Sequence, residues 1–163
     1  MKIKTLFLAF FAAFLLGGCL NLPEVPKISG LSFPVASAEE EITWVADEKK
    51  GKPVLIAVMA GYCGWCKKSL SALEIANQEF GDKAEVVGLF VDSDKATVQQ
   101  IIKDYNLKSQ ILYKGGDAAD ALKVQGFPHI LLFNKKHDLV KIWNGYSDTL
   151  ADQYRNELNK LLK

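Results

Sequence analysis

The sequence predicts an α/β fold in which a β-sheet is flanked by helices. From about residue 42 to residue 163, short apolar runs alternate with stretches in which apolar residues recur at helical spacing. This stretch has the length of one domain of ordinary size. Twenty basic and nineteen acidic residues leave a net charge of +1, without a basic block that would attract nucleic acid. We therefore expect one α/β domain and no nucleic-acid partner.

The first half of the domain predicts two strands joined by a long helix. Val54–Met59 is a continuous apolar run, which is typical of a strand buried on both faces. A helix is predicted over residues 67–80, with Gly81 as its C-cap. Residues 85–91 form the second predicted strand. The apolar stripe of the helix consists of Leu70, Leu73, Ala76 and Phe80.

The second half predicts three strands and three helices. A helix begins after Ser93 or Asp94, either of which is a suitable N-cap, and its apolar residues at helical spacing are Val98, Ile101, Ile102 and Tyr105. A short helix is predicted over residues 117–124, with Asp117 at its N-cap. The strands lie over residues 110–113, 128–133 and 139–143, the last two as a hairpin. An amphipathic helix with Leu150, Tyr154, Leu158 and Leu161 ends the chain.

The motif Cys63-Gly64-Trp65-Cys66 lies where the first strand gives way to the helix. Two cysteines three positions apart at a helix start lie on one face, close enough to form a disulfide. A helix N-terminus carries unpaired N–H groups and a partial positive charge, which favour the thiolate. Because the thiolate attacks in disulfide exchange, we expect Cys63 to be the nucleophile and Cys66 the resolving thiol.

Three other uses of the cysteine pair have to be weighed. A zinc site needs two further ligands, and only Cys19, His129 and His137 remain as cysteine or histidine, without metal-type spacing. A structural disulfide is possible, but a loop this short restrains little of the unfolded chain. A copper-binding lipoprotein is an alternative from another functional class. We expect no metal site and no cofactor.

The first eighteen residues resemble a lipoprotein signal peptide. A short basic start precedes an apolar run over residues 6–16, which is too short to span a bilayer as a helix. Leu16-Gly17-Gly18-Cys19 follows and resembles the lipobox of bacterial lipoproteins. That resemblance implies cleavage before Cys19 and acylation of its thiol; ordinary secretion is the alternative. The expected location is extracytoplasmic, with a lipid anchor in a bacterial membrane, on the periplasmic or outer cell-surface side.

Residues 19–41 predict a flexible tether between the lipid and the domain. Proline, serine and glycine are frequent there, and the apolar residues show no sustained period. The predicted organisation is therefore a signal peptide over residues 1–18, a lipidated tether over residues 19–41, and one domain over residues 42–163.

The order of strands and helices around Cys-x-x-Cys resembles the thioredoxin superfamily across the whole domain. Gly126-Phe127-Pro128 matches the position where that family keeps a cis-proline loop beside the dithiol. The resemblance implies a thioredoxin-like fold, a central mixed sheet flanked by helices. The additional unit at residues 92–113 resembles the strand and helix inserted in the membrane-attached TlpA and ResA group, which are thiol–disulfide oxidoreductases of the cell envelope.

This resemblance implies an activity, partners and site residues. Cys63 and Cys66 would be catalytic, and Trp65, Phe127 and Pro128 would contact the substrate. The partners would be protein disulfides or dithiols and a membrane electron donor of the DsbD or CcdA type that recharges a reductase. A disulfide-forming oxidase is the alternative within the enzyme class.

Two positions differ from the family pattern. Ala57 occupies the strand position where thioredoxins hold a buried aspartate, and Ser69 stands where the ResA subset carries an acidic residue. The sequence therefore shows no evident internal base for the resolving thiol. His129, which follows the proline, is expected to point away from the thiols.

Overall fold

The computed structural model describes residues 24–163. The predicted signal peptide and the predicted lipidation site, Cys19, lie outside the described residues. Within residues 24–163, no helix combines the length and apolar character needed to cross a membrane.

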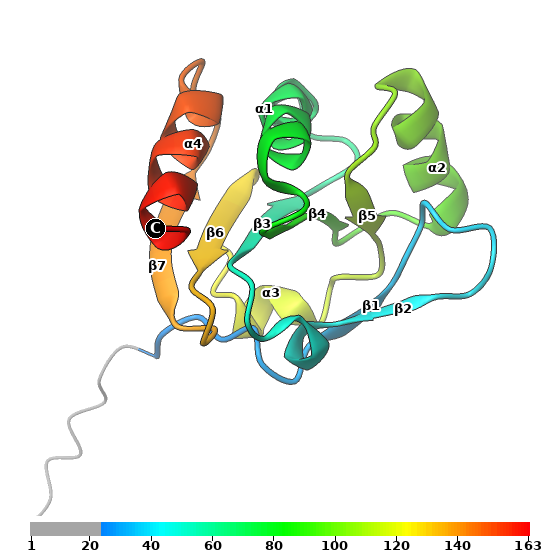
Figure 1. Cartoon of the computed structure of the whole chain (residues 1–163). Coiled ribbons are helices and arrows are strands. Elements are labelled where there is room, and N and C mark those ends of the chain that lie inside the picture. Colours follow the sequence, from blue (N-terminus) through cyan, green and yellow to red (C-terminus); the bar gives the residue numbers. More distant parts are fainter. Residues whose placement is uncertain (1–23) are drawn as a thin grey trace, which may run out of the picture.

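A five-stranded mixed sheet forms the centre of the molecule (Figure 1). Its strands, in spatial order, are β5 (Gln110–Leu112), β4 (Glu85–Phe90), β3 (Val54–Met59), β6 (His129–Phe133) and β7 (Leu139–Asn144). The first three run parallel to one another, and β6 and β7 are antiparallel to their neighbours. The sheet is therefore mixed, as the sequence predicts, and β3 lies at its centre.

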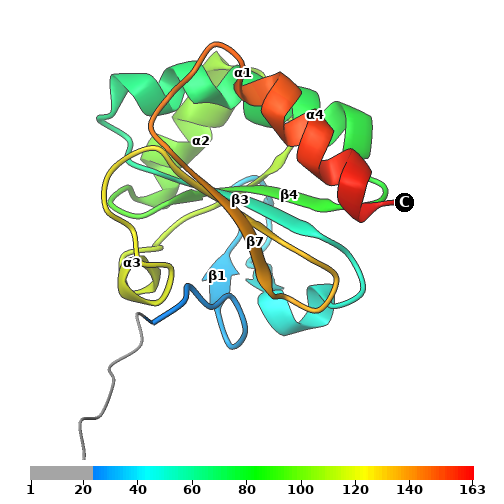
Figure 2. The ribbon, with the colours of Figure 1, turned by 90° about the vertical axis from the view of Figure 1, so that its left-hand side faces the viewer.

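Helices cover the two faces of the sheet unequally (Figure 2). One face carries α1 (Gly64–Phe80), α2 (Lys95–Asp104) and α4 (Leu150–Leu161), and the other carries α3 (Ala118–Ala121) and the chain before β3. Side chains of β3 alternate between an apolar cluster under α1 and α4 and a second cluster under α3. All six residues of β3 are buried, which confirms the prediction of a strand covered on both sides.

The segment before residue 42 belongs to the folded body, in contrast to the predicted tether. Strand β1 (Ser32–Pro34) pairs antiparallel with β2 (Thr43–Val45), and Val35 bridges to Leu112 at the edge of the large sheet. Ile28 is fully buried, and the Phe33 ring stacks on Trp44 with the ring centroids 6.1 Å apart. The domain boundary at residue 42 is therefore corrected to a position before Ile28. Strands of three residues are too short to show an alternating pattern in a proline-rich stretch.

Helix ends differ from the predictions by a few residues. Asp94 is the N-cap of α2, and its side chain accepts the Thr97 N–H at 2.8 Å, as one of the two predicted caps. Helix α1 begins at Gly64 rather than residue 67. Helix α3 is shorter than predicted, because the chain turns to a positive φ at Lys123, and Asp117 makes no side-chain cap.

Candidate active site

The dithiol lies at the carboxyl end of β3, where α1 begins. Cys63 is the N-cap of α1, and its Sγ accepts a hydrogen bond from the Cys66 N–H at 3.2 Å. The first-turn N–H groups of a helix have no partner within the helix, and here the sulfur supplies one. The Cys63 N–H in turn donates to the carbonyl of Ala60 at 3.1 Å. The Cys63 sulfur is thus held at the start of the helix.

The two thiols lie in different environments. Both are free, but Cys63 is partly exposed whereas Cys66 is 1% exposed. Burial raises the pKa of the Cys66 thiol to about 12, with smaller contributions from the hydrogen bond to Cys63 and the negative charge of Asp92. Cys66 is therefore a protonated, enclosed thiol at neutral pH, while Cys63 is open to a reaction partner.

The loop before β6 reaches the dithiol from a distant part of the chain. The Phe127–Pro128 peptide bond is cis, and the Cys63 thiol points at the carbonyl oxygen of Phe127, with 3.7 Å between sulfur and oxygen. The Gly145 N–H donates to the Pro128 carbonyl at 2.8 Å, which ties the loop to the end of β7. The structure therefore brings Phe127 and Pro128 to the cysteines, in the place that the family resemblance implies.

An aromatic surface, which we define as Tyr62, Trp65 and Tyr146, adjoins Cys63; Tyr62 and Trp65 are exposed, and Tyr146 is half-buried. Trp65 is 57% exposed and stacks on Tyr146, with ring centroids 5.7 Å apart and an interplanar angle of 21°. The ammonium group of Lys68 lies 4.4 Å from the centre of the Trp65 ring. Tyr146 was not among the predicted site residues; its only signal in the sequence is an aromatic residue just after the last strand.

Asp92 is a second residue at the site that sequence reasoning missed. Its Oδ1 accepts the N–H of Gly61 at 3.0 Å and the hydroxyl of Ser93 at 3.1 Å. Ala57 is buried under α1 and leaves no acid on β3. Ser69 is also buried, and its hydroxyl donates to the Cys66 carbonyl at 2.7 Å. The only sequence signal for Asp92 is a polar side chain at the end of the strand next to β3.

His129 faces away from the thiols, as expected from the sequence. Ile130 and Leu132 of the same strand lie in the cluster under α1, so the alternation of β6 directs His129 to the opposite face. Its Nδ1 lies 2.6 Å from the side-chain oxygen of Asn144, and burial lowers its pKa. Within residues 24–163, no group of three or more histidine, cysteine or acidic residues is placed to hold a metal ion.

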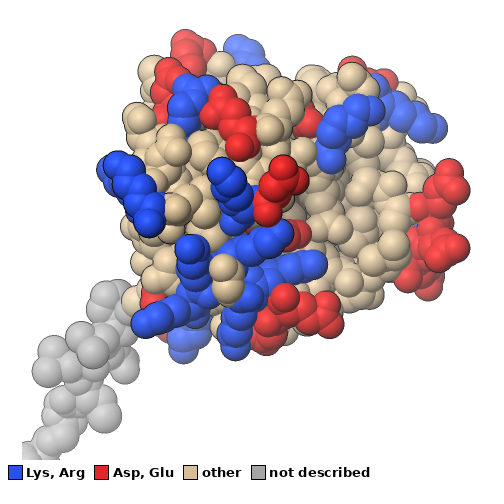
Figure 3. All heavy atoms as spheres, in the orientation of Figure 1, with Lys and Arg blue, Asp and Glu red and all other residues tan. Residues whose placement is uncertain are grey.

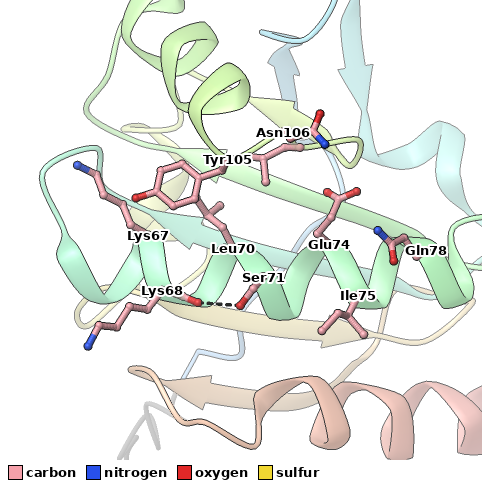
Figure 4. A pocket seen from close by; sticks show the side chains of 10 residues that line it. Lys67, Lys68, Leu70, Ser71, Glu74, Ile75, Gln78, Tyr105 and Asn106 are labelled. Atoms are coloured by element: carbon pink, nitrogen blue, oxygen red, sulfur yellow. Dashed lines mark hydrogen bonds between the residues drawn. The ribbon is translucent and has the colours of Figure 1, made fainter.

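A separate hollow of about 530 Å³ runs along the exposed side of α1, from Lys67 to Gln78 (Figure 4). It contains neither the cysteines nor the loop at Pro128. Glu74 in this hollow accepts the N–H groups of Lys108 and Ser109 through Oε2, both at 3.0 Å. This carboxylate therefore ties the connection between α2 and β5 to α1. The hollow is separate from the dithiol, which is the candidate active site.

Comparisons with known proteins find a family model and relatives that are similar to this chain. The family model described as Redoxin matches residues 24–162. Thioredoxin X of the Arabidopsis thaliana chloroplast is 32% identical over 78 residues, an alignment that covers 48% of this chain and 42% of that relative. The chain thus spans less than half of the length of this relative.

Solved structures share the fold. A putative thiol:disulfide interchange protein DsbE from Chlorobium tepidum superposes with a TM-score of 0.76 at 14% identity, over 87% of this chain and 99% of that one. The exposed lipoprotein thioredoxin of Streptococcus pneumoniae superposes with a TM-score of 0.68 at 22% identity, over 80% of this chain and 98% of that one. These likenesses confirm the predicted thioredoxin-like α/β fold.

Proposed function

The chain belongs to the Redoxin family, and from this premise we propose that it is a thiol–disulfide oxidoreductase of the thioredoxin type, which exchanges disulfides with protein partners. One observation carries the proposal. Two free thiols share the start of α1, and one is open while the other is buried and protonated. An unequal pair of this kind suits a reaction in two successive steps.

The reaction begins when the Cys63 thiolate attacks a sulfur of the substrate disulfide. A mixed disulfide forms between Cys63 and that sulfur, and the other substrate sulfur leaves as a thiolate. Cys66 then loses its proton and attacks the Cys63 sulfur, which releases the second substrate thiolate. The substrate has gained two electrons, and the protein now holds a Cys63–Cys66 disulfide. The Cys66 backbone N–H donates to the Cys63 sulfur, with 3.2 Å between nitrogen and sulfur. Because this hydrogen bond stabilises a Cys63 thiolate, it supports Cys63 as the group that attacks first.

The substrate surface consists of the loop at Phe127 and Pro128 together with Trp65. The Phe127 carbonyl oxygen lies 3.7 Å from the Cys63 sulfur, and Trp65 is 57% exposed. An exposed, stacked aromatic ring offers a large contact area with little loss of side-chain freedom on binding. These features support contact with an extended polypeptide that carries the substrate disulfide.

The direction of electron flow is proposed to be reductive, with a membrane donor of the DsbD or CcdA type recharging the dithiol. Support comes from the resemblance to the TlpA and ResA group and from the insertion formed by α2 and β5. The reduction potential tests this proposal. A value near the roughly −270 mV of thioredoxin supports a reductase, and one near the roughly −120 mV of DsbA supports the oxidase alternative.

We place the protein outside the cytoplasm, attached to a bacterial membrane through lipid on Cys19. The lipobox over residues 16–19 supports this location, as does the likeness to a solved protein described as an exposed lipoprotein thioredoxin. Cys19→Ser is expected to abolish incorporation of labelled palmitate and to remove the mature protein from the membrane fraction. Unchanged attachment without label would contradict the lipid anchor and would leave the dithiol chemistry untouched.

Trapping of partners tests the dithiol chemistry itself. Cys66→Ser removes the resolving thiol, so mixed disulfides with partner proteins are expected to accumulate in cell-envelope extracts. Cys63→Ser is the matched control and is expected to trap almost none. Both variants would be compared on non-reducing gels with and without dithiothreitol. Trapping through Cys66 alone, or equal trapping by both variants, would reverse or remove the proposed roles.

A further inference from the structure

Five lysines from two distant segments of the chain lie at one end of the sheet. We call this group the lysine face, and it consists of Lys49, Lys50, Lys52, Lys135 and Lys136. The first three precede β3, and the other two lie in the turn between β6 and β7. Val54 is paired with Phe133, and the Gly51 N–H donates to the Lys135 carbonyl at 2.9 Å, so the fold brings the two segments together.

Lysines outnumber acidic residues on this face. Four of the five lysines are exposed, and Lys49 is half-buried. The acidic residues of the same two segments are Asp47, Glu48 and Asp138. Asp47 pairs with Lys50 at 3.0 Å, and no other lysine of the face has an ion pair within residues 24–163. Figure 3 shows basic side chains gathered on the lower part of the molecule, with acidic ones beside them. The face therefore keeps an excess of positive charge.

The N-terminal segment enters the folded body on the side of the lysine face. The Gly30 N–H donates to Asp47 Oδ2 at 2.8 Å, and the same carboxylate pairs with Lys50. Figures 1 and 2 both show this segment and the turn between β6 and β7 on the lower side of the body. Cys19, the proposed lipid site, precedes Glu24 by five positions. A lipid on Cys19 would therefore hold this side of the body close to a bilayer.

The chemistry of the lysine face suits an anionic bilayer better than an acidic protein. Each lysine close to an anionic surface strengthens binding by about fivefold, and a bilayer offers many headgroup charges in one plane. Protein interfaces use aromatic or apolar side chains at their centre. The exposed large apolar side chains of the described chain all lie outside residues 46–52 and 134–138. The face thus has the charge for lipid headgroups and lacks an apolar anchor for a protein.

We propose that the lysine face lies on the anionic headgroups of the bilayer that holds the lipid on Cys19, an inference that rests on the location given in the proposed function. The dithiol lies at the carboxyl end of β3, whereas the lysine face lies at the amino end of that strand. The six residues of β3 separate the two ends by about 20 Å. Contact with the bilayer therefore leaves Cys63 open to protein partners.

Acetylation of lysines measures the contact directly. The mature protein is mixed with vesicles of phosphatidylcholine alone or with about 30% phosphatidylglycerol, treated with N-hydroxysuccinimidyl acetate, and examined by mass spectrometry. Anionic vesicles should slow acetylation of Lys52, Lys135 and Lys136 by at least about threefold, and roughly 1 M NaCl should remove this protection. Lys67 and Lys68, at the dithiol end, are internal controls and should react equally in both vesicles. Equal rates at the lysine face in the two kinds of vesicle would overturn the proposal.

A double variant tests whether charge causes the protection. Lys135→Gln with Lys136→Gln keeps the backbone bond to Gly51 and should reduce the docked population about 25-fold, so Lys52 should lose its protection. Lys67→Gln with Lys68→Gln removes the same charge at the dithiol end and should leave Lys52 protected. Full protection of Lys52 in the first variant would overturn the proposal.

Flotation and disulfide reduction separate this proposal from those on which it builds. Flotation with phosphatidylcholine vesicles reports the lipid anchor, and reduction of a protein disulfide reports the oxidoreductase function. Flotation with anionic vesicles alone, with the lysine face protected, would contradict the anchor and support the lysine face. Flotation with both kinds of vesicle without protection would contradict the lysine face and leave the anchor intact. Flotation with neither kind would contradict both.

Discussion

Single residues at the site owe their properties to where the fold places them. Cys63 and Cys66 are chemically identical and only three positions apart, yet Cys63 caps a helix at the surface and Cys66 is buried in the apolar cluster under α1. The difference arises from their places in α1, because Cys63 is the N-cap with an extended backbone, whereas Cys66 lies within the first turn and belongs to the buried apolar cluster.

Enclosure of Cys66 predicts slow reaction with alkylating reagents. The pKa is raised, so the thiolate is the minor form at neutral pH and its fraction grows about tenfold per pH unit. In Cys63→Ser, where burial remains but the neighbouring sulfur is gone, iodoacetamide should modify Cys66 at least about tenfold more slowly at pH 7 than it modifies an ordinary exposed thiol. Urea-unfolded protein is the control and should react at the ordinary rate. A folded thiol that titrates at the ordinary value would refute the prediction.

The Trp65–Tyr146 stack predicts a selective effect on large substrates. Aromatic pairs of this kind contribute about 0.5–1.5 kcal/mol beyond their buried area. Trp65→Ala should therefore lower kcat/KM for a protein disulfide by roughly 2- to 10-fold and leave reaction with a small disulfide unchanged. Tyr146→Ala should have a similar effect, and the double variant should be little worse than either single one. Tyr105→Ala, an exposed aromatic position on the separate hollow, is the control. Equal losses for both substrates would argue against contact with the polypeptide.

The sequence predicted the part of the site that is local in the chain. Cys63, Trp65 and Cys66 belong to one short motif, so their grouping needed no knowledge of the fold. Phe127 and Pro128 were assigned through a family resemblance, because no physical pattern in the sequence connects them to the cysteines. Tyr146 and Asp92 were missed, since their positions depend on how β7 ends and on the register between β3 and β4. Register is a property of paired strands, and neither strand carries it alone.

At the scale of elements, long and strongly apolar segments were predicted well. Strands β3 and β4, helix α1 and the hairpin of β6 and β7 appear where the periodicity indicates. The short elements β1 and β2 were not predicted, and α3 is half its expected length. β1, β2 and α3 are too short to show a reliable period in the sequence, and elements of this length depend on the rest of the fold for their stability.

The junction between the ends of β3 and β4 predicts a steric conflict at Gly61. Gly61→Ala places a Cβ against the Ser93 hydroxyl, and added atoms at a tight contact typically destabilise a protein by about 1–3 kcal/mol. Adding Ser93→Ala should restore most of the loss, because the next nearest atom is the Ser93 Cβ at 3.6 Å. Gly64→Ala is the control, as nothing lies within 4 Å of its added methyl group. Thermal unfolding would measure all variants, and an unaffected Gly61→Ala would show that the loops separate freely.

At the scale of the whole molecule, the N-terminal segment extends the sheet and covers one of its faces. The Ala36 N–H donates to the carbonyl of Ile111 at 2.8 Å, so the segment covers the edge formed by β5. The stability of the body therefore depends on residues that precede the predicted domain boundary.

Charged side chains of both signs lie on the face seen in Figure 3, with lysine and arginine gathered on its lower part and acidic side chains beside them.

A chain that begins at Ile42 should be much less stable than one that begins at Glu24. The shorter chain loses the buried side chains of Ile28, Phe33 and Val35 and exposes Trp44. Full burial of one such side chain contributes about 1.5–3 kcal/mol, so a loss of at least about 3 kcal/mol is expected. Urea denaturation would show it as a lower midpoint. Coincident unfolding curves for the two chains would mean that residues 24–41 act as a tether after all.

Because the N-terminal segment packs on the folded domain, the linker between this domain and the proposed lipid on Cys19 is short. Residues 20–23 alone separate Cys19 from Glu24, whose carboxylate pairs with Lys123 at 2.8 Å. The five chain steps from Cys19 to Glu24 reach at most about 18 Å when fully extended. With the proposed lipid in place, so short a linker would keep the body in a thin shell above the bilayer, where its effective concentration towards the proposed membrane-embedded redox partner would be on the order of millimolar. Encounter with that proposed partner would then depend on diffusion in two dimensions, and a longer linker would lower the effective concentration of the dithiol without altering its chemistry.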